Sequence, residues 1–188
     1  MMWLILGLAL WSGVHLVKPL APALRTRLGE RLGEGIWMLV VVVLLVLSIW
    51  LMAIGYGRAS AEALWIAPLW LRHLTVALMV PAFMLFTATY PGSWLKARIR
   101  HPQLIGFKLW AALHLAVNGD VRSLVLFGGI LVWAVVALIA IDRRDGKPPL
   151  PPADGNPLRA WAFVPSGLVV WAVVFWAHGA LFGVYPLT

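Results

Sequence analysis

The chain has 188 residues, of which 62% are hydrophobic and 12% are charged, and it contains 12 tryptophans and no cysteine. A soluble domain is nearer half apolar and about a quarter charged, so this composition predicts an integral membrane protein. The lack of cysteine excludes disulfides and thiolate ligands, and the net charge of +8 is explained by basic residues between apolar runs rather than by nucleic-acid binding.

The chain contains six long apolar runs, which predict six membrane spans. Five spans are possible if one run does not cross the membrane. The runs cover residues 2–17, 36–54, 71–90, 102–118, 123–141 and 160–185. Only helices and closed barrels satisfy their backbone in lipid, and these runs are too long and uniform for barrel strands. The predicted fold is all-α, a bundle of about six transmembrane helices in a single domain over residues 1–188.

Local signals mark several helix ends in chain order. Between the first and second runs, Leu24 begins a leucine repeat of every four residues, which predicts a short amphipathic helix on the inner membrane surface. Pro81 is expected to kink the third run, and Pro102 suits the first turn of the fourth. Asp120 is the expected N-cap of the fifth run, and the proline-rich residues 148–157 predict a non-helical linker.

Basic residues alternate along the connections between these runs. Those after the first, third and fifth runs are Lys18, Arg25, Arg27, Arg31, Lys96, Arg98, Arg100, Arg143, Arg144, Lys147 and Arg159. The other two connections carry only Arg58, Arg72 and Arg122. Cytoplasmic loops are the basic ones, so both termini are predicted to lie outside, in a multi-pass protein of a cytoplasmic (inner) membrane.

The five histidines can be sorted by depth from this topology. At 1.5 Å of rise per residue, His15 lies about 18 Å below the outer end of its run and His114 about 16–18 Å above the inner end of its run. Both fall near the middle of a hydrocarbon core of about 30 Å. His101 is expected at the inner surface, and His73 and His178 are expected near the outer one.

Two imidazoles at one height on two helices are how membrane bundles hold haem. This spacing predicts His15 and His114 as iron ligands. Trp11 and Trp110 lie on the same helix faces as these histidines and suit a flat, apolar cofactor, and Asn118 is placed to hydrogen-bond a ring nitrogen.

Each of these residues also has an alternative, purely structural role. A histidine within a span also serves to hydrogen-bond a neighbouring helix. Lys108 either extends to the inner surface or pairs with a haem propionate. His73 and His178 are either interfacial side chains or ligands of a metal or second cofactor.

The run RHPQLIGFKLWAALHLAVNGD at residues 100–120, with GLALWSGVH near the start of the chain and LFGG in the fifth run, resembles the NnrU family of bacterial membrane proteins, which includes the plant zeta-carotene isomerase domain. The resemblance covers nearly the whole chain. It implies haem b with two histidine ligands, which by motif are His15 and His114. The plant relative has a long N-terminal extension that this sequence lacks, and no residue here identifies a carotenoid site.

The resemblance implies a haem protein that supports nitrite and nitric oxide reduction in denitrification, with nitric oxide as a ligand and a redox partner. An alternative is a haem-dependent cis-trans isomerase of a polyene such as zeta-carotene. A third is a non-enzymatic membrane assembly or partner protein with structural histidines. Whether the protein is an enzyme stays open among these three. Its acidic residues lie in loops or at run ends, which disfavours hydrolysis and proton pumping by buried carboxylates.

Overall fold

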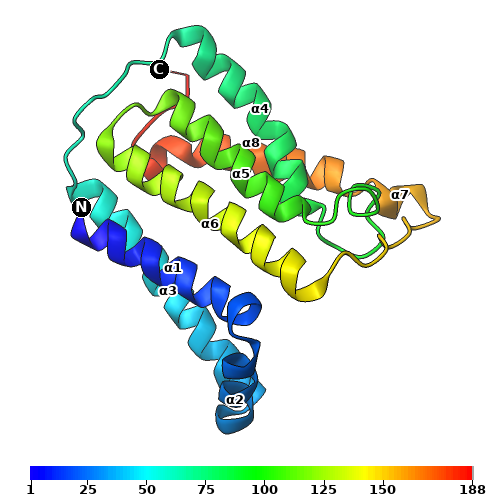
Figure 1. The fold of residues 1–188 in the computed structure, drawn as a ribbon. Helices are drawn as coiled ribbons and strands as arrows, with labels where there is room; N and C mark the ends of the chain where they lie inside the picture. The colour runs from blue at the N-terminus through cyan, green and yellow to red at the C-terminus, as the bar shows by residue number, and fades with distance from the viewer. Residues whose placement is uncertain (188) are drawn as a thin grey trace. The chain divides into compact units, whose positions relative to one another are not determined.

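The computed structural model describes residues 1–187, and these residues form helices without a strand (Figure 1). The helices are α1 (Met2–Leu20), α2 (Pro22–Leu32), α3 (Glu34–Arg58), α4 (Leu69–Thr87), α5 (Pro102–Val117), α6 (Val121–Asp145), α7 (Pro157–Ala160) and α8 (Phe163–Phe182). The prediction of an all-α fold is confirmed.

The chain divides into two compact units, each made of two stretches of sequence. The first unit consists of residues 1–64 and 120–147, and therefore contains α1, α2, α3 and α6. The second unit consists of residues 65–119 and the chain from Pro148 onward, and contains α4, α5, α7 and α8. The sequence predicts a single domain over residues 1–188, and the division into two compact units does not test that prediction.

Among residues 1–187, five helical segments are long and apolar enough to cross a membrane, so this is a multi-pass membrane protein. They are Met2–Leu20, Glu34–Arg58, Leu69–Thr87, Val121–Asp145 and Pro157–Phe182. The remaining apolar helix, α5, has 16 residues. It therefore rises about 24 Å, which is less than the roughly 30 Å of a hydrocarbon core. The predicted orientation of the termini stays a prediction.

In the first unit, α1 packs closely against α3 because glycines remove side chains from the contact. A Cβ on Gly7 would lie 2.7 Å from the backbone nitrogen of Met52. A Cβ on Gly55 of α3 would collide with the backbone of Leu4. Small residues at such crossings let helices in lipid gain van der Waals contact. The fourth helix of this unit, α6, reaches α1 at Gly129, where a Cβ would meet Leu8 at 2.9 Å.

In the second unit, α4 packs against both α5 and α8, again at glycines. A Cβ on Gly106 of α5 would lie 3.1 Å from the carbonyl oxygen of Ala82, and one on Gly167 of α8 would lie 2.7 Å from the Cα of Met84. Met79, Ala82 and Leu113 form the buried cluster between α4 and α5. These contacts fix the height of α5 along α4, and so the height of His114 within this unit.

Helix ends agree with the local signals more closely than with the limits of the apolar runs. Asp120 caps α6, since its carboxylate accepts a hydrogen bond from the Ser123 backbone N–H at 2.9 Å, as predicted. Pro102 begins α5, also as predicted. Helix α3 continues to Arg58 and α6 continues to Asp145, beyond the apolar runs that end at residues 54 and 141. Polar residues extend a helix once it leaves the apolar layer.

The last helix ends earlier than its apolar run, at Phe182, because Gly183 adopts a φ of 69°. The proline-rich linker is non-helical up to Asn156, as predicted, and Pro157 begins α7. Pro81 lies inside α4, which is continuous from Leu69 to Thr87, so the expected kink stays a prediction. The amphipathic helix expected between the first two runs is α2.

Candidate functional site

His15 lies on α1 in an aromatic cluster of the first unit. Its Nδ1 is 2.9 Å from the carbonyl oxygen of Trp11, one helical turn earlier. Its ring centroid lies 4.2 Å from that of Trp11 and 5.0 Å from that of Trp133, which comes from α6. Trp133 is only 4% exposed, and it also contacts Trp11 edge-on at 5.4 Å. Two indole rings from two helices therefore hold one imidazole in place.

His114 lies in the last turn of α5, and its surroundings in the second unit are similar. Its Nδ1 is 2.9 Å from the carbonyl oxygen of Trp110, and the two ring centroids are 4.6 Å apart. Trp110 packs in turn against the buried cluster of Met79, Ala82 and Leu113. The ring of this histidine is therefore held by its own helix and by the packing between α4 and α5.

The two histidines belong to one repeated sequence pattern. Residues 7–16 read GLALWSGVHL and residues 106–115 read GFKLWAALHL, so both have the form Gly-x-x-Leu-Trp-x-x-x-His-Leu. Glycine, tryptophan and histidine follow one another at intervals of four, which places them along one helix face. In each copy the glycine is the point of close approach to a neighbouring helix. The pattern therefore combines a helix-packing point with an oriented imidazole.

The Nδ1 hydrogen bond determines which ring nitrogen carries the lone pair. A backbone carbonyl only accepts, so Nδ1 must be the protonated nitrogen and Nε2 the basic one. Metal-bound histidines in proteins are oriented in this way, with the second ring nitrogen donating to a carbonyl. The donor chemistry of His15 and His114 therefore fits axial ligation of a haem iron through Nε2.

The other histidines differ from this pair. His73 makes the same type of bond, from Nδ1 to the Leu69 carbonyl at 3.0 Å, but the residue one turn earlier is leucine and the ring is exposed. His178 bonds to the carbonyl of Val184 at 2.6 Å. His101 occupies the N-cap position of α5. Among residues 1–187, no three or more His, Cys, Asp or Glu side chains gather where they could hold a metal ion.

Two further predicted site residues lie on α5 and at its end. Asn118 donates through its side-chain amide to the backbone carbonyl of His114 at 2.9 Å, and its backbone N–H reaches the same oxygen at 2.8 Å. It thus closes the C-terminus of α5 one turn after His114. Lys108 is partly exposed on the same helix, and both roles considered for it remain predictions.

Trp133 was not predicted from the sequence, although it is the most buried side chain beside His15. Its position could have been suspected from Gly129, one turn earlier on α6, because a glycine on a transmembrane helix indicates where another helix approaches.

The buried Thr75 was not predicted from the sequence either. Its hydroxyl is buried and has no hydrogen-bond partner among residues 1–187, and it lies on the buried face of α4, one turn before Met79.

The NnrU protein family matches residues 3–186, which is nearly the whole chain. The chain belongs to the NnrU family. No curated protein and no solved structure is similar enough to match it. The resemblance seen in the sequence is therefore confirmed at the level of the family. Both copies of the Gly-Trp-His pattern fall inside the region that NnrU members share.

Proposed function

We propose that this NnrU protein is a membrane haem b protein in which His15 and His114 are the two axial ligands, and that it supports nitrite and nitric oxide reduction. The observation that carries the proposal is the repeated local geometry. In each unit an imidazole donates from Nδ1 to the carbonyl of a tryptophan one turn earlier, and that same indole packs against the ring. The denitrification role rests on family membership alone.

The protein's own residues would do three things for such a cofactor. The backbone carbonyls of Trp11 and Trp110 hold the two rings in the tautomer whose Nε2 is basic. The indole rings beside them, together with Trp133, limit ring rotation and give apolar walls. In the first unit, the buried indole of Trp133 would limit the access of water to the His15 ring, which affects both the redox potential and the retention of a bound group.

Haem held by His15 and His114 would supply a one-electron couple and a coordination site for a small ligand such as nitric oxide. Each histidine would bind iron as the neutral imidazole, whose Nδ1 donates to a backbone carbonyl. The nearest acid in sequence to His114 is Asp120, and its carboxylate is engaged at the start of α6. The chain therefore provides orientation and an apolar setting rather than acid–base chemistry.

The test is the haem content of purified protein and of three single variants. His15→Ala and His114→Ala should each lose most of the bound haem, because a single remaining imidazole holds the macrocycle weakly. His73→Ala is the matched control, since it removes a histidine with the same Nδ1-to-carbonyl bond at an exposed position. Equal haem content in all three variants and the unmodified protein would rule out this pair as ligands.

A haem-dependent polyene isomerase is the second candidate, and one feature of the second unit favours it. Phe83 and Phe86 of α4 and Phe107 of α5 form a continuous aromatic row, with centroid distances of 5.7 and 4.9 Å. Phe107 lies seven residues before His114 and so on the same face of α5. Such a row suits the flat chain of a conjugated lipid.

Incubation of reduced, haem-loaded protein with cis-polyenes, followed by chromatography, separates these candidates. Conversion to the trans isomer that is lost in His114→Ala would favour the isomerase. A strain whose nitrite and nitric oxide reduction survives the double variant His15→Ala/His114→Ala would instead favour a non-enzymatic assembly or partner role.

A further inference from the structure

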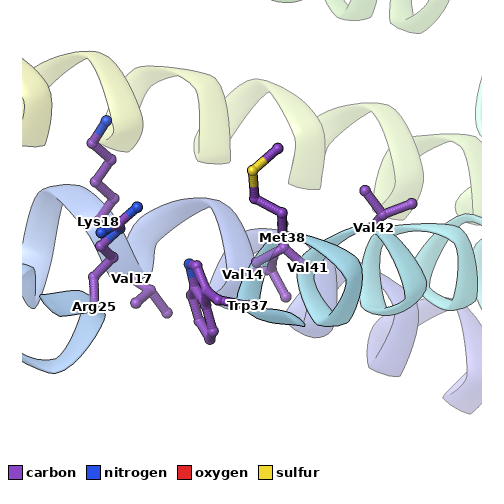
Figure 2. Close-up of a pocket in the computed structure, with 8 residues that line it drawn as sticks. All are labelled: Val14, Val17, Lys18, Arg25, Trp37, Met38, Val41 and Val42. Carbon is purple, nitrogen blue, oxygen red and sulfur yellow. The ribbon is translucent and has the colours of Figure 1, made fainter. Parts of the chain in front are cut away.

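A cavity of about 270 Å³ lies where α1, α2 and α3 meet in the first unit (Figure 2). It is lined by apolar side chains of α1 and α3 and by one cation each from α1 and α2. The apolar ones include Val14, Val17, Met38 and Val41, and the cations are Lys18 and Arg25. Figure 2 shows the two cationic side chains together at one end of the cavity, with Val41 and Val42 at the other.

The two cations differ in how they are compensated. The Arg25 guanidinium donates to both carboxylate oxygens of Glu34, at 2.7 and 2.6 Å, so Glu34 holds it in place and offsets its charge. Lys18 makes no hydrogen bond or ion pair with any of residues 1–187. One positive charge at this end of the cavity therefore stands without a protein counter-ion, while the guanidinium keeps N–H donors that Glu34 does not use.

The cavity lies at the level where an inner-leaflet headgroup is expected. Lys18 ends the apolar part of α1, and α2 follows with more basic than acidic residues. Leu20, Leu24 and Leu32 are 61%, 48% and 40% exposed, which gives the α2 region a partly exposed apolar face. A basic segment with such a face lies along the surface of an anionic leaflet. Trp37 beside the cations matches the usual place of tryptophan at the headgroup level.

We propose that this cavity binds one anionic phospholipid of the inner leaflet. The lipid phosphate would be held by the Lys18 ammonium and by the outer N–H groups of Arg25, and the first part of an acyl chain would lie along Val14, Val17 and Val41. A zwitterionic lipid fits less well, because its own cation would compete with Lys18. The site does not use the proposed haem ligands, since neither His15 nor the tryptophans beside it line the cavity.

Native mass spectrometry of the full-length protein in detergent, titrated with phosphatidylglycerol or phosphatidylcholine, tests this directly. A surface cation contributes about 1 kcal/mol to binding an anionic lipid, so Lys18→Gln should weaken phosphatidylglycerol binding about fivefold. Lys18→Arg should restore it. Arg27→Gln removes the same charge from α2 outside the cavity, and it should change the affinity by less than twofold.

A second variant tests the apolar half without changing charge. Val41→Trp would fill the cavity, and it should weaken phosphatidylglycerol binding at least as much as Lys18→Gln does. Equal effects of Lys18→Gln and Arg27→Gln would overturn the proposal, because the attraction would then be diffuse. Equal affinity for the two lipids would also overturn it, as would displacement of the lipid by inorganic phosphate alone, which would indicate a simple anion site.

Discussion

Gly7 on α1 provides the sharpest test of how the first unit is packed, because Gly13 on the same helix is a matched control. A Cβ on Gly7 would lie 2.7 Å from the Met52 backbone nitrogen and from the Ser48 carbonyl oxygen of α3. A Cβ on Gly13 would meet no atom within 4 Å. Both Gly7→Ala and Gly13→Ala place the same methyl group in a helix interior.

The intrinsic gain of alanine over glycine in a helix, about 0.5–1 kcal/mol, applies to both variants. At Gly7 the overlap is with backbone atoms, which cannot rotate away, so the cost is that of overpacking, about 1–3 kcal/mol. Gly13→Ala should therefore raise the free energy of unfolding slightly. Gly7→Ala should lie about 1–3 kcal/mol below Gly13→Ala, which corresponds to a roughly fivefold to 150-fold change in the unfolding equilibrium.

Unfolding of the two variants by sodium dodecyl sulfate in mixed micelles, followed by far-ultraviolet circular dichroism, measures this difference. Haem content of the same samples shows whether the packing of α1 also affects the cofactor. If Gly7→Ala proves as stable as Gly13→Ala, α1 and α3 do not approach as closely as described.

Three further substitutions test contacts of α6 within the first unit. Asp120→Ala removes the cap of α6 and should lower the free energy of unfolding by about 1 kcal/mol in the same assay, whereas Asp120→Asn should retain most of it. Tyr56→Phe removes the 2.7 Å hydrogen bond to the Ser123 hydroxyl, and a loss of about 1 kcal/mol is expected; no loss would mean that this bond does not form. Trp133→Leu removes the indole beside His15 and should speed haem transfer to apomyoglobin, followed by absorbance, while Trp176→Leu, at a site 86% exposed, should not.

The sequence predicts the elements of this fold well because apolar length and turn chemistry are local properties. The cap at Asp120, the start of α5 at Pro102 and the non-helical linker all follow from a few adjacent residues. The exact ends of α3 and α6 cannot be predicted in this way, since these helices continue to Arg58 and Asp145, beyond the apolar runs.

Packing between helices is harder to predict in a membrane protein. Lipid and protein interior are equally apolar, so hydrophobicity does not tell which face of α6 is turned toward α1. Trp133 contacts His15 across more than a hundred residues of sequence, and the one local hint of this contact is Gly129, one turn earlier on α6. Trp11 and Trp110 were predicted because they are one turn from a histidine on the same helix.

The central claim is that one haem takes one imidazole from each copy of the Gly-Trp-His pattern, and electron paramagnetic resonance of the oxidised, purified protein tests it most directly. A low-spin ferric signal typical of two axial imidazoles is expected, with conversion to high spin or loss of haem in both His15→Ala and His114→Ala. A protein without haem, or a low-spin signal that both variants retain, would contradict the claim.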